Sequence, residues 1–340
     1  MAAEVLCCGG LRVDYLITAH GEPHLGEMGG NALYAACGAR LWSSSVGVLA
    51  RAGANYPRDW LETLSMQGFD MRGVRPLPFA CDHRTFYAYL DEDTRDDTNP
   101  AAHFARWGLP LPDALRDYVH STPGQDDPHT YEPLAVQPDD LQRYLALSNA
   151  PPRVLHIAPI SIRTQRYLPE AARAAGVPLI CVDPGERAMC PALQPFIEAM
   201  LSLVDAFLPS WQEVRTFFAD APPGDALECA RWFATRGPRF VAIKLGSEGV
   251  LVYDHRRGHA WHLPPAPARV VDVTGAGDAF CGGFAAALAQ TDDALHAALR
   301  GAVSASFAVE GYGPLAILRA DEREKQQRLR ALMARCRIVR

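Results

Sequence analysis

The sequence predicts an α/β fold in which a mostly parallel sheet carries helices on both faces. Short apolar runs of the length of buried strands alternate with longer segments that have helical periodicity. This alternation is typical of βαβ units, whose parallel strands are buried on both sides. Of the 340 residues, 49% are hydrophobic and 21% are charged, and this balance is ordinary for one large folded core.

Six apolar runs are the expected strands of this sheet, and six helical patterns lie between or after them. The strands are expected at Val5–Cys8, Ser45–Leu49, Val154–Ala158, Leu179–Val182, Ala206–Leu208 and Phe240–Leu245. The helices are expected at Asn31–Leu41, Arg58–Met66, Ile162–Ala175, Gln212–Phe218, Asp225–Thr235 and Ala279–Gln290.

Functional side chains are expected at one edge of the sheet, because ligands of such folds gather at the carboxyl ends of the strands. The candidates that follow strands or lie near their ends are Asp14, the Gly29–Gly30 turn, Asp183, Glu213, Gly246 and the turn at residues 274–278. Such a placement predicts one shared crevice.

The turn TGAGD at residues 274–278 is the most informative motif. The β-branched run Val270–Val273 before it predicts a buried strand, and the small residues from Ala279 onward predict a helix. Glycine permits positive φ and a close approach of ligand to backbone, and the N–H groups that open a helix attract anions. An anion site beside the carboxylate of Asp278 has the parts that phosphoryl transfer to a hydroxyl needs. Taken alone, the motif also fits a simple turn with Asp278 on the helix dipole.

The stretch DVTGAGDAFCGGF resembles the C-terminal motif of the ribokinase-like (PfkB) carbohydrate kinases. Other stretches resemble that family's landmarks in family order: GGLRVD near the N-terminus, GGNA with its following helix, GVLARAGANYPRDWLETLSMQGFD, LPSWQEV and VAIKLGSEGVLVYD. The resemblance covers roughly Val5 to Pro314. It implies a single ribokinase-like domain over residues 1–340, with a small β-sheet lid formed by about residues 14–28 and 82–98.

The resemblance implies an ATP-dependent phosphotransferase that phosphorylates a hydroxyl of a sugar or sugar-like small molecule. Asp278 would be the base, and the amides of Gly275, Ala276 and Gly277 would stabilise the transferred phosphoryl group. A carboxylate at a helix N-terminus should be ionised and only weakly basic, which suffices when the hydroxyl proton leaves late.

The acceptor side is expected at Asp14, Gly29, Gly30 and Asn31. Each oxygen of an aspartate can accept a separate O–H donor, so Asp14 suits vicinal hydroxyls. Gly30 would let the backbone approach the substrate beside Asn31. The alternative for Asp14 is a plain surface residue.

The nucleotide side is expected at Lys244, Gly246, Gly249 and Ser306. A lysine in a buried strand is costly unless its charge is used, so we expect Lys244 to contact phosphate. The two glycines would leave space for the nucleotide, and residues 305–313 would close its adenine side. Asp183, in VDPGER, fits either phosphate geometry or a turn.

The resemblance also implies metal ions. Glu213 matches the acid of an Asn-x-x-Glu motif that arranges magnesium-bound water and phosphate, although Ser210 stands where the family has asparagine. Asp272 would help to hold a monovalent cation (K+) or would simply cap the turn. The expected cofactors are therefore ATP and Mg2+, with K+ as a further expectation.

Three segments fall outside the alternation of strands and helices. Residues 84–95 are aromatic and partly alternating, which predicts an exposed-face strand and a turn. Residues 99–140 are dense in Pro, Asp and His and form an insertion, either a surface loop or an element that covers substrate or forms an oligomer. The basic C-terminal segment has helical spacing and predicts a solvated amphipathic helix.

Several classes of protein are disfavoured. The net charge of −6 and the lack of a run of five Lys or Arg argue against a nucleic-acid partner. Apolar runs are too short for a membrane span, and the N-terminus lacks the basic region of a signal peptide. Nine scattered cysteines without a C-x-x-C pair indicate neither zinc nor a disulfide framework, so we expect a reducing cytoplasm. A homodimer through the lid is the one protein partner that we expect.

Competing functions remain open at this point. A nucleoside kinase of the same fold is the nearest alternative, followed by a non-catalytic sensor of sugars or nucleotides. An oxidoreductase on a doubly wound sheet lacks support, because no G-x-G-x-x-G follows the first strand, and no P-loop motif is present. The identity of the acceptor has no readable code in the sequence.

Overall fold

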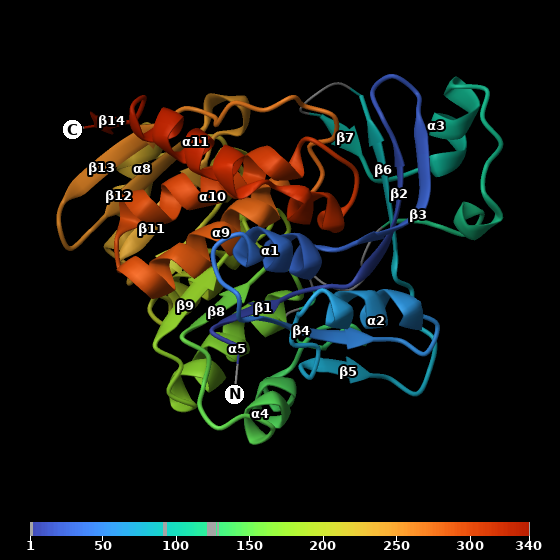
Figure 1. Ribbon diagram of the computed structural model, residues 1–340, viewed down its shortest axis with the longest axis horizontal. Coiled ribbons are helices and arrows are strands. Elements are labelled where there is room, and N and C mark those ends of the chain that lie inside the picture. Colours follow the sequence, from blue (N-terminus) through green and yellow to red (C-terminus); the bar gives the residue numbers. More distant parts are fainter. Residues whose placement is uncertain (1–2, 91–93, 121–126, 128, 340) are drawn as a thin grey trace.

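The computed structural model, which describes residues 3–90, 94–120, 127 and 129–339, has a ten-stranded sheet flanked by helices and a separate four-stranded sheet (Figure 1). The strands of the large sheet are, in spatial order, β14 (Arg337–Val339), β13 (His259–Leu263), β12 (Val250–Asp254), β11 (Phe240–Lys244), β10 (Ala206–Phe207), β9 (Leu179–Val182), β8 (Val154–Ile157), β1 (Val5–Cys8), β4 (Val46–Ala52) and β5 (Val74–Pro76). The seven neighbouring strands from β11 across to β5 pair in parallel. The remaining strands at the other end, β12, β13 and β14, are antiparallel. The predicted mostly parallel sheet is confirmed.

The helices lie on both faces of the large sheet, apart from the third, which packs on the small sheet. They are α1 (Asn31–Arg40), α2 (Arg58–Met66), α3 (Pro100–Arg106), α4 (Pro138–Ala146), α5 (Ile162–Ala174), α6 (Gln194–Leu201), α7 (Trp211–Phe217), α8 (Ala226–Ala234), α9 (Ala276–Thr291), α10 (Ala294–Ala308) and α11 (Glu322–Met333). Strand β1 shows how two cores arise, because side chains alternate across a strand: Val5 and Cys7 join the core under α1, α9 and α10, whereas Leu6 and Cys8 join the core under α4 to α8.

The start of α9 is held against α1 by close contact between helices. A Cβ atom on Gly282 would lie 1.8 Å from the carbonyl oxygen of Ala35, and one on Gly38 would lie 2.2 Å from that of Ala279. Only glycine permits this approach of the two backbones. It places the turn at residues 274–278 beside the first turn of α1.

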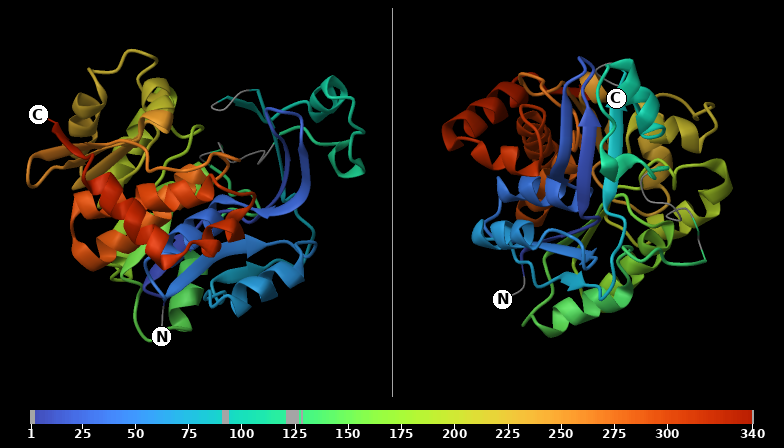
Figure 2. Two further views of the ribbon diagram at one scale, coloured as in Figure 1. Left: turned by 45° about the horizontal axis from the view of Figure 1, so that its top comes forward. Right: turned by 90° about the vertical axis from the view of Figure 1, so that its right-hand side faces the viewer.

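The small sheet has the order β3-β2-β6-β7 and stands apart from the large one (Figure 2). Its strands are β2 (Arg12–Ile17), β3 (Pro23–Gly29), β6 (Arg84–Tyr89) and β7 (Arg95–Asp96). These strands overlap the segments 14–28 and 82–98 that the sequence assigns to a lid, although β2 begins at Arg12 and β3 ends at Gly29, and we call them the lid sheet. Whether they act as a lid stays a prediction.

The insertion at residues 99–140 is not a plain surface loop in its described part. Phe104 of α3, Leu115 of a 3-10 turn and Tyr118 are buried against Ile17 and Phe86 on the outer face of the lid sheet. The predicted exposed face of residues 84–95 is therefore wrong for β6, because the insertion covers it. Residues 91–93, 121–126 and 128 lie outside the described residues. A homodimer through the lid stays a prediction, but this chain already fills the outer face.

The predicted strand at Val270–Val273 is wrong. Val270 is exposed, and the N–H groups of Val271 and Asp272 donate to the carbonyl oxygen of Val309 at 2.7 and 3.2 Å. The end of α10 thus satisfies the donors that a neighbouring strand would have taken. The C-terminal helix is confirmed as α11, and the edge strand β14 after it was not predicted. Within the described ranges, no helix is both long and apolar enough to span a bilayer.

Candidate active site

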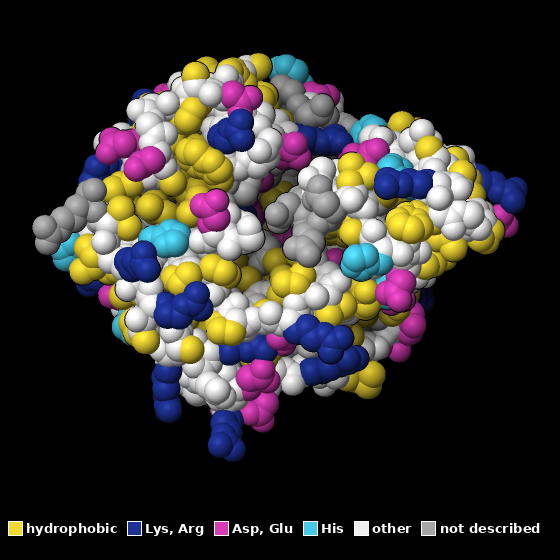
Figure 3. Space-filling view, turned by 90° about the horizontal axis from the view of Figure 1, so that it is seen from above, with side chains coloured by type: hydrophobic (Ala, Val, Ile, Leu, Met, Phe, Trp, Pro, Cys, Tyr) yellow, Lys and Arg dark blue, Asp and Glu magenta, His cyan; other side chains and the backbone are white. Residues whose placement is uncertain are grey.

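A cavity of about 230 Å³ lies between the lid sheet and the carboxyl ends of the large sheet's strands. Figure 3 shows the molecular surface hollowed between the larger and the smaller part of the molecule. The walls of the cavity come from β2, α1, β6, β7, the loops after β8 and β9, and the turn before α9. The predicted crevice thus exists, and Asp14, Gly30, Asn31, Gly275 and Asp278 line it.

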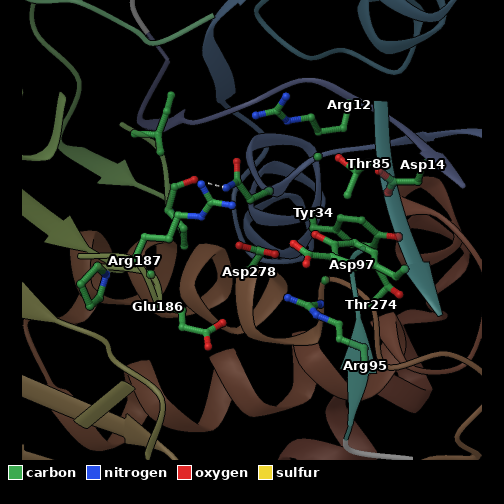
Figure 4. Close-up of a pocket in the computed structure, with 18 of the residues that line it drawn as sticks. Arg12, Asp14, Tyr34, Thr85, Arg95, Asp97, Glu186, Arg187, Thr274 and Asp278 are labelled. Atoms are coloured by element: carbon green, nitrogen blue, oxygen red, sulfur yellow. Dashed lines mark hydrogen bonds between the residues drawn. The ribbon is translucent and has the colours of Figure 1, made fainter. Parts of the chain in front are cut away.

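Asp278 lies in the first turn of α9 and faces the middle of the cavity, near Asp97 and Arg95 (Figure 4). Burial raises the pKa of its carboxyl to about 6, against the opposing positive charges of Lys244 and Arg95. The expectation of a weakly basic carboxylate is therefore wrong, because desolvation outweighs the helix N-terminus. Near neutral pH the group is ionised and more basic than an exposed aspartate.

The N–H groups before Asp278 only partly match the predicted anion site, because that of Ala276 is used by the protein. Gly275 is the N-cap of α9, with φ of 73°, and its Cβ would lie 2.2 Å from the ring of Tyr34. Ala276 donates its N–H to Val273, whereas the N–H groups of Gly275 and Gly277 have no protein acceptor among the described residues. Gly277 is helical, so of the two glycines in this turn only Gly275 has a positive φ. Free N–H groups at a helix start are suited to an anion.

Lys244, the last residue of β11, lies directly under this arrangement. Its Nζ is 2.5 Å from Asp183 Oδ2 and donates to Cys281 Sγ at 3.8 Å. A Cβ on Gly277 would be 3.6 Å from the same Nζ. Burial, the largest single influence, favours the neutral amine, but Asp183, Cys281 and Glu213 together outweigh it and raise the pKa of Lys244. The lysine thus remains a cation at the base of the anion site.

Ser210 and Glu213 form a reciprocal cap at the start of α7. Ser210 N donates to Glu213 Oε2 at 2.6 Å, and Glu213 N donates to Ser210 Oγ at 3.2 Å. Serine in place of the family's asparagine therefore holds the acid in position. Burial, helped by the negative charge of Asp183, raises the pKa of Glu213 to about 7.

Asp272 is bound to the turn through one oxygen and has a second oxygen without a partner. Its Oδ1 accepts from Thr274 N at 2.9 Å and from Thr274 Oγ1 at 2.7 Å. Its Oδ2 is buried with no hydrogen-bond partner among the described residues, and burial raises the pKa of the carboxyl. An orphaned carboxylate oxygen suits a hard cation, as predicted for this residue.

Asp14 is 5% exposed, lies on β2 and faces the cavity. Burial raises the pKa of its carboxyl to about 7, with Arg12 acting in the opposite direction. Gly29 is required beside it, because a Cβ there would lie 1.7 Å from Asp14 Oδ2. Gly30 has φ of 106°, and its Cβ would meet the carbonyl oxygen of Gly10 at 2.4 Å.

Asn31 lines the cavity, but its amide is used by the protein. Gly10 N donates to Asn31 Oδ1 at 2.8 Å, and Asn31 Nδ2 donates to the carbonyl oxygen of Pro159. The side chain thus ties the loop after β1 to the loop after β8. The sequence suggested an amide free to bind substrate hydroxyls, but the Asn31 amide is already hydrogen-bonded to the protein.

Of the other residues predicted to bind the nucleotide, Gly246 leaves space for a ligand, whereas Gly249 and Ser306 serve the fold. Gly246 has φ of 60° and nothing within 4 Å of an added Cβ, so it leaves space. A Cβ on Gly249 would lie 2.0 Å from the carbonyl oxygen of Leu263, so the hairpin itself requires this glycine. Ser306 is buried, and its hydroxyl donates to Val303 and accepts from Arg328. A free nucleotide-binding hydroxyl at Ser306 is therefore wrong.

Sequence reasoning missed most of the charged and aromatic wall of the cavity. The residues without an earlier role are Arg12, Tyr34, Thr85, Tyr87, Arg95, Asp97, Glu186 and Arg187. Alternation along β6 could have indicated Thr85 and Tyr87, because every second residue of a strand shares a face. The arginines carry no local signal of this kind.

Comparisons with known proteins agree with this architecture. A family model described as pfkB family carbohydrate kinase matches residues 139–320, more than half of the chain. The cytidine kinase of Thermococcus kodakarensis is 25% identical over 283 residues, which are 83% of this chain and 87% of that protein. Burkholderia thailandensis nucleoside kinase in complex with inosine superposes with a TM-score of 0.70 at 18% identity, covering 97% of this chain and 99% of the other.

A putative ribokinase II of E. coli in complex with ATP and Mg2+ superposes with a TM-score of 0.69 at 19% identity, again over 97% and 99% of the two chains. These likenesses confirm the ribokinase-like fold. With the family match over residues 139–320, they establish that the chain belongs to the pfkB family of carbohydrate kinases.

Proposed function

We propose that the protein transfers the terminal phosphoryl group of ATP to a hydroxyl group of a sugar or sugar-like small molecule. One observation carries the proposal: a buried carboxylate, Asp278, lies in the same first helical turn as the unpartnered N–H groups of Gly275 and Gly277. These are the parts that accept a hydroxyl proton and stabilise a moving phosphoryl group.

Asp14 and Asp278 would each bind a different hydroxyl of the acceptor. Asp14, on the lid sheet, would accept hydrogen bonds from substrate hydroxyls and orient them. The reacting hydroxyl would donate to Asp278, whose pKa of about 6 leaves it ionised at neutral pH. Because the transition state is loose and the proton leaves late, Asp278 needs only to be positioned and ionised.

The phosphoryl group would be stabilised by the backbone and by two cations. The N–H groups of Gly275 and Gly277 would donate to its oxygens from the positive end of α9. Lys244, whose side chain is 15% exposed, would add a positive charge from below Gly277. Arg95 would add another from β7, where it stacks on Tyr87 at 4.2 Å.

The residues present fit a metal ion bound mainly through nucleotide phosphates. The described residues hold no cluster of three His, Cys, Asp or Glu placed as a complete cage, and Mg2+ usually needs only one or two carboxylates besides phosphates. Glu213 is the carboxylate that would serve it. The ion would neutralise charge on the β- and γ-phosphates. Asp272 Oδ2, which has no partner among the described residues, fits the K+ expectation.

A nucleoside acceptor is the second candidate. The cytidine kinase resembles this chain over 83% of its length, and the inosine-bound kinase shares the fold over 97%. Such an acceptor would present the same kind of ribose hydroxyls to Asp14. The base would then have to fit beside the loops after β8 and β9, which include Ile160 and Glu186.

The test is a coupled ADP-release assay of purified protein against sugars, sugar acids, sugar phosphates, polyols and nucleosides, with Mg2+ and with or without K+. Release that depends on one acceptor class supports transfer to that class. Asp278→Asn is the matched variant: turnover should fall by about a hundredfold or more, with ATP affinity retained. ATP binding without acceptor-dependent release in any class would instead favour the non-catalytic sensor.

A further inference from the structure

Arg12 is a cavity-lining cation that the proposed mechanism does not use. It is the first residue of β2 and is only 7% exposed. In Figure 4, Arg12 lies across the cavity from Arg95. Asp278 lies between these two arginines, and Asp14 lies to one side. The side chain therefore lies at the opposite end of the cavity from Arg95.

The guanidinium of Arg12 has almost no hydrogen-bond partners. Its Nη1 donates to the carbonyl oxygen of Asp82 at 3.5 Å, a long contact. A guanidinium carries five N–H donors, and no carboxylate among the described residues lies within ion-pair distance of this one. Glu132, Asp14 and Asp82 act on it only through longer-range attraction.

Burial makes this arrangement costly. Desolvation is the largest influence on Arg12 and lowers its pKa, but an arginine does not lose its proton in a protein. A buried cation without close partners is destabilising unless an anion completes its hydrogen bonds. Within the cavity, that anion has to be brought by a ligand.

We propose that Arg12 binds an anionic group, a carboxylate or a phosphate, at the end of the acceptor remote from its phosphorylated hydroxyl. The planar fork of arginine matches both groups through two parallel hydrogen bonds. The acceptor would thus be a sugar acid or a sugar phosphate. This inference rests on the proposed function and narrows its substrate class.

The other pocket arginines have positions suited to different partners. Arg95 lies on the ring of Tyr87 and close enough to Asp278 to affect its pKa. Arg187 Nη2 lies 3.3 Å from His120 Nδ1. Arg12 instead shares the inner face of β2 with Asp14. One strand would therefore present a cation to the anionic group and a carboxylate to the neighbouring hydroxyls.

The experiment compares kcat/KM for matched acceptors: gluconate against glucose, and fructose 6-phosphate against fructose. The variants are Arg12→Gln, which removes the charge, and Arg12→Lys, which keeps it without the planar fork. Arg84→Gln is the matched control, because Arg84 lies on the neighbouring strand and pairs with Asp82 and Asp117 outside the cavity. Melting temperatures and ATP affinity are measured for every variant.

We expect the wild type to prefer the anionic member of at least one pair, and the two pairs distinguish carboxylate from phosphate. Arg12→Gln should reduce the ratio of anionic to neutral kcat/KM by about ten- to a hundredfold, with the KM for ATP retained. Arg12→Lys should reduce it less, and Arg84→Gln should not change it.

Two results would overturn the inference. The first is equal efficiency of the wild type with neutral and anionic acceptors, or with nucleosides alone; this leaves phosphoryl transfer itself intact. The second is an unchanged ratio in Arg12→Gln. Absence of ADP release with every acceptor would contradict the proposed function itself.

Discussion

The hydroxyl oxygens of Tyr89 and Thr274 lie 2.5 Å apart and join the lid sheet to the turn that opens α9. Thr274 Oγ1 donates to Asp272 Oδ1, so its proton is committed and Tyr89 must donate to it. Strand β6, which lines the cavity, is thus linked directly to the turn before α9. This bond gives the two halves of the proposed site a fixed relative position.

We expect Tyr89→Phe to lower kcat/KM for the acceptor by up to about tenfold, the scale of one neutral hydrogen bond. The lid sheet would lose its link to the turn, while the ATP site would keep its own contacts. Steady-state kinetics and ATP titration measure the two effects. Tyr15→Phe, on the outer face of β2, is the control. Equal kinetics in Tyr89→Phe and the wild type would show that the bond does not position the lid.

Asp278→Asn should increase stability at alkaline pH while it removes turnover. Burial raises the pKa of Asp278 from 3.8 to about 6, so the folded chain binds the proton more tightly than the unfolded chain. Its contribution to stability is therefore fully present below about pH 4 and is lost as the pH rises through 6. At pH 8 the variant should be more stable by about 3 kcal/mol.

Urea unfolding at pH 8, 6 and 4 measures this difference, which should shrink toward zero at pH 4. In the same pH range, wild-type turnover should decline below about pH 6, because the base becomes protonated. A variant that is less stable than the wild type at pH 8 would show that the ionised carboxylate is stabilised in the folded chain, contrary to its burial.

The two glycines of the turn should respond differently to alanine. Gly275 has φ of 73°, and a Cβ there would enter the ring of Tyr34. We expect Gly275→Ala to lower the free energy of unfolding by at least about 1–2 kcal/mol, the cost of a left-handed alanine. Gly277 is helical, and its Cβ would meet only Lys244, at 3.6 Å.

Gly277→Ala should therefore fold at least as stably as the wild type, since alanine favours helix over glycine by about 1 kcal/mol. Its effect should appear in ATP affinity, because the methyl group lies beside the ammonium of Lys244. Denaturant unfolding and ATP titration separate the two variants. Similar unfolding free energies for both would contradict the assigned backbone conformations.

Phe104 of the insertion should support acceptor binding from outside the cavity. Its ring is 1% exposed and lies 6.1 Å from that of Phe86, across the outer face of the lid sheet. Loss of a fully buried Phe costs about 3–5 kcal/mol. In Phe104→Ala the lid sheet should therefore be destabilised. The KM for the acceptor should rise more than the KM for ATP.

Val119→Ala is the control for this variant, because Val119 belongs to the same insertion and is 72% exposed. Hydrogen exchange should show faster opening of β6 in Phe104→Ala and no change in Val119→Ala. Unaltered exchange in β6 would mean that the insertion does not stabilise the lid sheet.

Local patterns in the sequence predicted the secondary structure well wherever local interactions decide it. The helix Arg58–Met66 and the strands Val5–Cys8 and Leu179–Val182 have the predicted bounds, because hydrophobic periodicity reports which face is buried. The same reasoning failed at Val270–Val273, where β-branched residues pair with no strand of the described part of the chain. Pairing depends on what the rest of the chain places alongside.

By itself, the sequence determined the alternating architecture, the glycine turn before α9 and the presence of carboxylates at the crevice. Spacing and residue type suffice for these features. Only the tertiary structure decided that Arg12, Tyr87 and Arg95 meet at one cavity, because the lid sheet brings them together from distant positions. It also decided the basicity of Asp278. The helix dipole is readable from a motif, but the opposing desolvation arises from every segment that packs around the carboxyl group.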